Sequence, residues 1–305
     1  MKKIRIPIYI VLGLFLTTFI LGSFFDYQIN SALFSRDNPF GLTIAAIGTI
    51  PGYGVFAIVG GGLFAFFLKK EYPIVARVFL MIGAVGCACL GILFSGREIF
   101  GVNGFYHKGW NTYGYLIVSP IMFGFAFLGF SFTRKSDNPY LWIVYIVIMI
   151  AVFVALVPGV TMIKSIFHRP RYRFLDLTGE NFYPWWKPCK NYNELLASYE
   201  SIGVTKDEFK SFPSGHTGGA AVSMVFAMIL PLINRKYMKY QLPIFFGCLA
   251  WTLLVAFTRM LVGAHFLSDI SMGGLLTMIC AMIANEVVIH HKLTKQYQLE
   301  ETVIE

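Results

Sequence analysis

Residues 140–163, YLWIVYIVIMIAVFVALVPGVTMI, contain no charged side chain and end directly before Lys164. A helical apolar run of about 20 residues is long enough to cross the hydrocarbon core of a bilayer. The segment is therefore predicted to be a transmembrane helix with a cation at its end.

The rest of the chain has the composition of an integral membrane protein. Its 305 residues are 56% hydrophobic and 13% charged, whereas about 25% of the residues of a soluble domain are charged. The apolar runs that are long enough to span a bilayer lie at 7–25, 51–68, 74–94, 115–132, 140–163, 218–233, 242–262 and 268–289. We predict an all-α, polytopic helix bundle with about eight transmembrane helices in the cell membrane. Two of the runs are rich in glycine, which is commoner in membrane helices than in soluble ones.

The basic residues indicate an orientation, because Lys and Arg collect in cytoplasmic loops. Those in alternate loops are Lys2, Lys3, Arg5, Lys69, Lys70, Arg77, Arg134, Lys135, Arg235, Lys236 and Lys239. With their side in the cytoplasm, Lys164, His216 and His265 fall on the extracytoplasmic face. The basic cluster after residue 163 breaks the rule, and either a headgroup anchor or a phosphate site would explain it. The net charge of +9 needs no nucleic-acid partner, since no nucleic-acid motif accompanies it.

Three short segments at the ends of apolar runs carry the polar side chains of a phosphoryl-transfer site. They read KSIFHRPRY (164–172), PSGH (213–216) and TRMLVGAHFLSD (258–269). Phosphoryl transfer needs fixed cations and N–H donors around the phosphate oxygens. We assign Lys164, Arg171 and Arg259 to this task.

The PSGH segment predicts an anion cradle. A helix that begins just after Pro213 would point its free N–H groups at the anion, and Ser214 and Gly215 would let the backbone approach closely. Taken alone, PSGH is equally consistent with an ordinary turn into a helix, because Ser is a good N-cap.

Two of the histidines are predicted to have different catalytic roles. His265 and Asp269 are spaced i, i+4, which places both on one face of a helix, so that the carboxylate orients the imidazole. His265 is then the nucleophile, and His216 beside the cradle is the general acid for the leaving oxygen. His168 has no carboxylate at a helpful spacing and is interpreted as an interfacial side chain. A structural His–Asp pair would have the same spacing, and the three segments in order favour the functional interpretation.

The three segments resemble the signature of the type 2 phosphatidic acid phosphatase superfamily, K-x6-R-P, P-S-G-H and S-R-x5-H-x3-D. The chain departs from it at Tyr172, where the family has Pro, and at Thr258, which keeps the hydroxyl of Ser. The resemblance covers residues 140–289 and implies a six-helix phosphatase core. Residues 1–135 would then hold two helices beyond that core, 136–292 the catalytic core with an extracytoplasmic loop at 165–213, and 293–305 a cytoplasmic tail.

The resemblance implies a metal-independent membrane lipid phosphatase that forms a phosphohistidine on His265. The alternatives are a lipid phosphotransferase and a non-hydrolytic lipid-phosphate binder or transporter on the same fold. Vanadium haloperoxidases share such a site but are not built from membrane spans. Phosphatidylglycerophosphate, polyprenyl diphosphate, phosphatidate and lipid A phosphates all fit as substrates. We expect no cofactor, no metal site and no disulfide, and the oligomeric state is not predicted.

The hydrophilic segment 169–212 is long enough to have its own role. Its aromatic side chains include Trp185 and Trp186, which suit either an interfacial belt or a lid that admits a lipid phosphate. The amphipathic stretch 192–199 is predicted to be helical.

Overall fold

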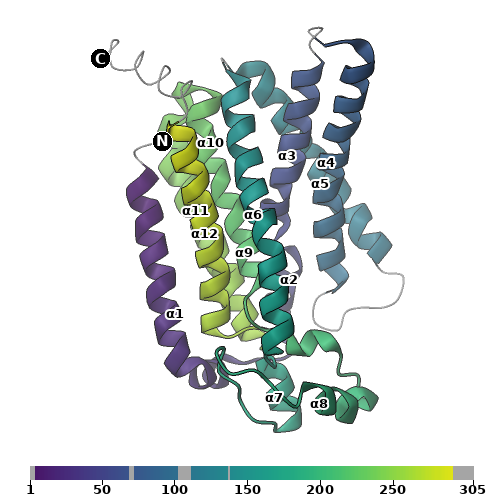
Figure 1. The fold of residues 1–305 in the computed structure, drawn as a ribbon, viewed down its shortest axis with the longest axis vertical. Helices are drawn as coiled ribbons and strands as arrows, with labels where there is room; N and C mark the ends of the chain where they lie inside the picture. The colour runs from purple at the N-terminus through teal and green to yellow at the C-terminus, as the bar shows by residue number, and fades with distance from the viewer. Residues whose placement is uncertain (1–3, 69–71, 102–110, 137, 291–305) are drawn as a thin grey trace.

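The computed structural model describes residues 4–68, 72–101, 111–136 and 138–290, which form a bundle of long, roughly parallel and antiparallel helices (Figure 1). Within these ranges no residue lies in a strand. The α-helices are α1 (Arg5–Leu33), α2 (Pro39–Ile47), α3 (Ile50–Phe67), α4 (Ile74–Gly101), α5 (Asn111–Lys135), α6 (Pro139–Phe167), α7 (Tyr172–Thr178), α8 (Tyr192–Tyr199), α9 (Gly215–Ala221), α10 (Val225–Ile233), α11 (Gln241–Leu261) and α12 (Leu267–His290). The all-α fold class is confirmed.

Each predicted apolar run lies in helical structure except for one residue at the end of 51–68 and of 242–262, and several helices, α1 and α4 among them, extend beyond their runs. Seven segments of the described chain are long and apolar enough to cross a membrane, and the eighth run lies in α6, which is apolar from Pro139 to Val152 and continues to Phe167. The run 218–233 comprises α9, a 3-10 turn at Val222–Met224 and α10. The predicted tail at 293–305 and the residues Lys2, Lys3, Lys69 and Lys70 lie outside the described residues.

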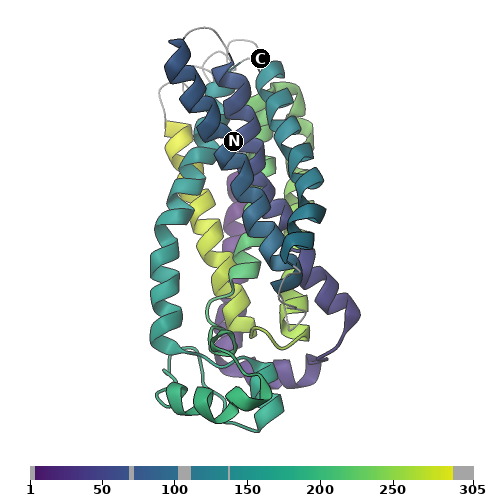
Figure 2. The ribbon, with the colours of Figure 1, turned by 90° about the vertical axis from the view of Figure 1, so that its right-hand side faces the viewer.

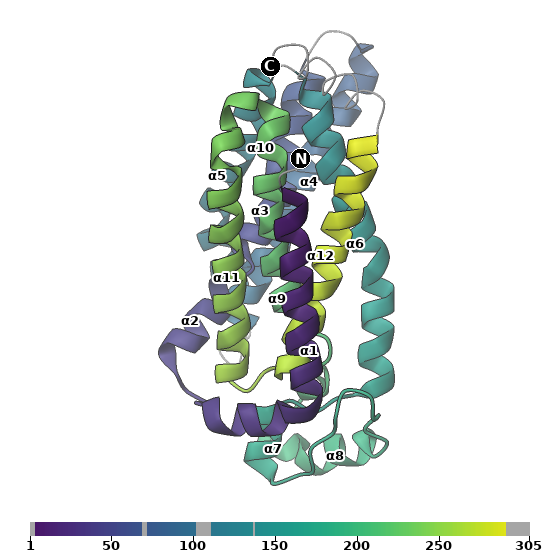
Figure 3. The ribbon, with the colours of Figure 1, turned by 90° about the vertical axis from the view of Figure 1, so that its left-hand side faces the viewer.

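The sequence analysis did not predict α2. Asn38 ends the preceding turn, and its side chain caps the helix by accepting a hydrogen bond from the N–H of Gly41 at 2.9 Å. Pro39 occupies the first helical position, where its missing N–H costs nothing. Figure 3 shows α2 turned away from the bundle before α3 enters it.

Glycines explain how α3 and α5 pack. A Cβ atom at Gly61 would lie 1.8 Å from the carbonyl oxygen of Ala126, and one at Gly129 would lie 1.9 Å from that of Ile58. Both positions therefore exclude any side chain. Small residues let membrane helices approach closely, so the glycine-rich runs are packing surfaces of the α3, α4 and α5 group.

The remaining long helices surround the polar segments. In Figure 3, α1 lies along α12, and an ion pair between Arg5 and Glu286 joins the two at one end. The main core lies between α1, α3, α6, α10, α11 and α12 and includes the fully buried Trp142, Tyr145 and Phe245.

The hydrophilic segment is folded, and we call residues 168–214 the cap. It covers the other end of the bundle, at the bottom of Figures 1 and 2. Phe174, Leu195 and Phe209 form a small core with Phe266 of the bundle. The predicted helix at 192–199 is confirmed as α8. The ring of His168 stacks on Tyr192 at 3.9 Å.

Candidate active site

Backbone hydrogen bonds join the three predicted segments at the end of the bundle that the cap covers. They run from Ser211 N to Arg169 O (3.1 Å), from Arg173 N to Gly263 O (3.0 Å) and from Ser214 N to Asp269 O (2.9 Å). Segments up to a hundred residues apart in the chain are thus fixed against one another.

The PSGH segment starts a helix as predicted. Ser214 is the N-cap of α9, and its Oγ accepts a hydrogen bond from the N–H of Thr217 at 3.3 Å. On the facing helix α12, a Cβ atom at Gly273 would lie 2.2 Å from the carbonyl oxygen of Ser214. The contact requires glycine at 273 and holds the start of α9, with His216 in its first turn, against α12.

His265 lies in the turn between α11 and α12. Gly263, at φ +64°, makes this turn, and α12 begins only at Leu267. The prediction that His265 and Asp269 share a helical face was therefore wrong in its local structure, because His265 precedes the helix.

The ring of His265 is held by a backbone carbonyl. Its Nδ1 lies 2.6 Å from the carbonyl oxygen of Ser211. A carbonyl only accepts, so Nδ1 carries the proton and the neutral ring keeps its lone pair on Nε2. Burial lowers the pKa of His265 well below its usual range, while Asp269 raises it and Arg259 lowers it. A neutral imidazole with a free Nε2 lone pair is a nucleophile.

Asp269 is buried beside this ring and accepts several hydrogen bonds. Its Oδ2 accepts from Ser211 Oγ at 2.5 Å and from the N–H of Phe266 at 2.8 Å. The same Oδ2 lies 3.8 Å from Nδ1 of His265, which is an ion-pair distance and not a hydrogen bond. Asp269 thus supports His265 by charge and through Ser211, which both residues contact and which the sequence analysis missed.

Arg169 was also missed as a site residue. Its side chain is 1% exposed, and its Nη1 donates to Oδ1 of Asp269 at 2.5 Å. Its Nη2 donates to Oδ2 of Asp26 in α1 at 2.8 Å, and the guanidinium lies 4.2 Å from the centre of the Phe266 ring. A signal existed in the sequence, because a carboxylate within an apolar helix requires a buried partner.

The predicted phosphate-binding cations lie near one another but are not paired like Arg169. Arg259 is 1% exposed, and within the described chain its Nε and Nη1 have no hydrogen-bond partner, nor has Nε of Arg171. Burial, and then the charge of Arg173, lowers the pKa of Arg171 to about 10. Lys164 Nζ donates to the carbonyl oxygen of Lys210 at 2.9 Å. Buried donors without partners are costly, so this donor set fits an anion with several oxygens.

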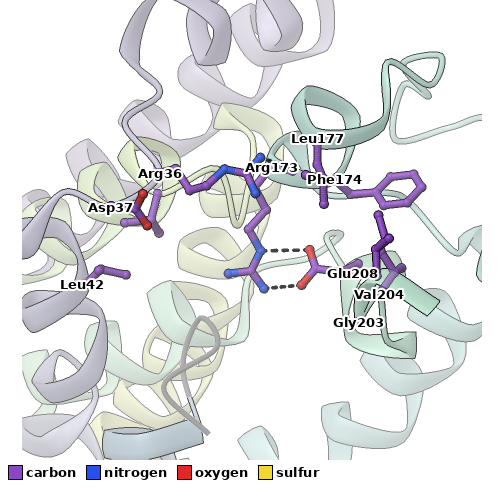
Figure 4. Close-up of a pocket in the computed structure, with 11 residues that line it drawn as sticks. Arg36, Asp37, Leu42, Arg173, Phe174, Leu177, Gly203, Val204 and Glu208 are labelled. Atoms are coloured by element: carbon purple, nitrogen blue, oxygen red, sulfur yellow. Dashed lines mark hydrogen bonds and ion pairs between the residues drawn. The ribbon is translucent and has the colours of Figure 1, made fainter. Parts of the chain in front are cut away.

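Arg173, by contrast, is neutralised by Glu208. Its Nε and Nη2 donate to the two carboxylate oxygens at 2.8 and 2.5 Å. Figure 4 shows this pair in the wall of a cavity of about 400 Å³ that Arg36, Phe174 and Val262 also line. The cavity lies beside the site, since the backbone of Arg173 is bonded to Gly263.

His216 faces a carboxylate from a part of the chain that the motifs do not include. Its Nε2 lies 3.1 Å from Oε2 of Glu98, near the end of α4. The two atoms are at ion-pair distance without the alignment of a hydrogen bond. The other oxygen of Glu98 accepts from Arg97 at 3.1 Å.

The departure at Tyr172 is accommodated by packing. Tyr172 is buried at the start of α7, where its ring meets those of Phe34 at 5.1 Å and Phe266 at 6.2 Å. The N–H of Arg171 is held by the carbonyl oxygen of Glu208 at 2.8 Å, so the backbone beside Tyr172 remains fixed. Thr258 is buried, and its hydroxyl donates to the carbonyl oxygen of Val255.

The described residues contain no group of three or more His, Cys, Asp or Glu side chains placed to hold a metal ion.

Comparisons with known proteins identify the family of the chain. The model of the PAP2 superfamily matches residues 139–292, which include all three segments. Phosphatidylglycerophosphatase B of Haemophilus influenzae (strain ATCC 51907 / DSM 11121 / KW20 / Rd) is 29% identical over 177 residues, which are 53% of this chain and 71% of that protein. The search of solved structures gave no significant match.

Proposed function

The chain belongs to the PAP2 superfamily and is a membrane lipid phosphatase, and we propose that it removes a terminal phosphate from a lipid through a phosphohistidine on His265. The observation that carries the proposal is the position of the His265 ring, whose Nδ1 is bound to Ser211 O next to buried guanidinium donors without partners. The nucleophile, His265, therefore lies beside the proposed phosphate-binding site.

In the first step, the lone pair of His265 Nε2 forms a bond to phosphorus. The bond between phosphorus and the lipid oxygen breaks, its electron pair stays on that oxygen, and His216 supplies a proton to it. Arg171, Arg259 and Lys164 hold the other phosphate oxygens, together with the N–H groups that follow Ser214 and include that of Gly215. Asp269, 3.8 Å from Nδ1, stabilises the positive charge that develops on the ring.

In the second step, water hydrolyses the phosphohistidine. His216, now neutral, takes a proton from the water, whose oxygen bonds to phosphorus, and the electron pair of the nitrogen–phosphorus bond returns to Nε2. The first-step acid thus serves as base in the second step. None of these steps needs a metal ion, because the cations supply the charge stabilisation.

The substrate is proposed to be a lipid phosphate monoester, with phosphatidylglycerophosphate as the first candidate. This follows from the name of the Haemophilus influenzae relative and from a cationic site at one end of a membrane bundle. Polyprenyl diphosphate, phosphatidate and lipid A phosphates remain alternative substrates with the same terminal group.

The proposed site faces the extracytoplasmic side, because the short loops at the opposite ends of the helices carry basic residues such as Arg134, Lys135 and Arg235, and short basic loops are typically cytoplasmic. Residues 136–292 would form the catalytic core with the loop 165–213, and 1–135 would add helices to it. The cap would act as a lid over the phosphate site, since it packs on the bundle through Trp185, whose Nε1 donates to Ser23 Oγ of α1 at 2.9 Å.

A panel assay tests the proposal. The purified protein is mixed with each of these lipids in detergent, and released phosphate is measured with and without added alcohol acceptors. We expect phosphate release from at least one lipid by the wild type and none by His265→Ala. Transfer to the acceptor in place of water would indicate the phosphotransferase, and lipid binding without any product would contradict the enzyme.

A further inference from the structure

Glu98 contacts the predicted general acid from a part of the chain that the PAP2 match does not cover. The match begins at residue 139, whereas Glu98 lies near the end of α4, within the first 135 residues. Its Oε2 is 3.1 Å from Nε2 of His216. A helix outside the shared family region therefore contributes directly to the surroundings of the predicted general acid.

Both side chains are largely enclosed, since His216 is 16% and Glu98 15% exposed. The other charges that face the imidazole belong to Arg259 of α11 and Arg171 of the cap. Two guanidinium groups oppose a positive charge on His216, and within the described chain Glu98 is the carboxylate that favours it. A carboxylate beside an imidazole stabilises its doubly protonated form, which is the form that can give up a proton.

We propose that Glu98 is a positioning residue that stabilises the protonated form of His216 and turns its Nδ1 toward the leaving oxygen. Nε2 faces Glu98, so Nδ1 is the nitrogen that remains for the substrate. Donor and acceptor at such sites are commonly poorly aligned until substrate binds, which accounts for a close contact without hydrogen-bond alignment. The proposal rests on the proposed function, in which His216 is the acid.

Arg97 would assist by fixing the carboxylate. Its Nη2 donates to Oε1 of Glu98 at 3.1 Å, which leaves Oε2 for the imidazole. The helices α3, α4 and α5 pack against one another and so fix the position of Glu98 in α4. These helices would therefore contribute to catalysis.

The test exploits the leaving group. An alkoxide needs a proton as it leaves phosphorus, whereas a nitrophenolate does not. Two phosphate monoesters that carry the same alkyl chain, one an alkyl and the other a nitrophenyl ester, are given to purified wild type, Glu98→Gln and Glu98→Asp. Glu286→Gln is the matched control, because it removes a carboxylate paired with Arg5 at the opposite end.

For Glu98→Gln we expect kcat/KM on the alkyl ester to fall by roughly 10- to 100-fold, within the range of general acid catalysis. Its kcat/KM on the nitrophenyl ester, which reports the steps up to the phosphohistidine, should stay within about threefold of wild type, because the binding and nucleophilic parts of the site are intact. Glu98→Asp should recover part of the loss, and Glu286→Gln should resemble wild type on both esters.

An equal loss of activity on the two esters would mean that Glu98 has only a structural role. No loss of activity on either ester would mean that Glu98 does not contribute to catalysis. Both results overturn the inference. A second measurement uses His216→Ala and the alkyl ester, on which Glu98→Gln should have no further effect in this background, since the residue that it acts through is gone. Failure of the wild type to release phosphate from either ester would contradict the proposed function instead.

Discussion

The guanidinium of Arg169 donates to the carboxylate of Asp269 at 2.5 Å, and neither side chain is more than 1% exposed. The pair connects the cap to the first turn of α12, and Asp26 extends it to α1. His265 is thus supported by charges that come from three separate parts of the chain.

The first prediction concerns stability. Arg169→Ala leaves two buried carboxylates without their cation, and breaking a buried pair costs about 3–5 kcal/mol. Thermal unfolding in detergent should therefore show a large fall in Tm for Arg169→Ala. The exposed pair of Lys210 and Asp207 provides the control, because Lys210→Ala should change stability by less than about 1 kcal/mol. Similar Tm values for the two variants would contradict a structural role for Arg169.

The second prediction follows from the lowered pKa of His265, which burial causes chiefly. In the unfolded chain His265 binds a proton near pH ~6.5, whereas in the folded protein it binds one only at a lower pH. The free energy of unfolding is therefore highest above about pH 6.5 as far as His265 is concerned, and it decreases as the pH falls below that value. Between about pH 7.5 and about 5.5, the wild type should lose more Tm than His265→Ala. An equal loss in both proteins would show that His265 is not buried as a neutral ring.

The third prediction concerns metal ions and a transition-state mimic. Cations of the protein are proposed to hold the phosphate, so EDTA should not reduce activity. Vanadate, which adopts a five-coordinate geometry, should inhibit. The matched variant is Arg259→Gln, in which the buried guanidinium is lost and inhibition by vanadate should weaken. A reproducible need for added magnesium would argue for another mechanism.

The fourth prediction concerns sidedness. Cys189 is buried in the cap and must first be replaced. A cysteine at Ser198, which is exposed in α8, should then react with an impermeant thiol reagent in intact cells. One at Gln298 should react only after permeabilisation. The reverse pattern would place the reaction on lipids of the cytoplasmic leaflet.

The long helices could be predicted from the sequence because the length of an apolar run is a local property. The role of Gly61 and Gly129 could not be predicted in this way, because it depends on the close contact of α3 with α5, which are separate helices. The three segments were assigned to one site from residue types and order, and they do lie together.

The supports of the site could not be predicted in the same way. The i, i+4 spacing of His265 and Asp269 suggested a helical face, whereas a turn at Gly263 places His265 before α12. The bond from Nδ1 goes to a backbone carbonyl, which any residue at position 211 would offer. Glu98 meets His216 through the packing of separate helices, and no local pattern encodes that contact.

Detection of the covalent intermediate tests the central claim most directly. The purified protein is mixed with phosphatidylglycerophosphate, quenched in alkali within the first turnovers, digested and examined by mass spectrometry, because phosphohistidine survives alkali. His265→Ala and Asp269→Asn are treated in parallel; the first should form no phosphopeptide, and the second should form it slowly, since the nucleophile remains while its support is weakened. The account predicts phosphate on His265 in the wild type. Phosphate on another residue, or normal turnover by His265→Ala, would contradict it.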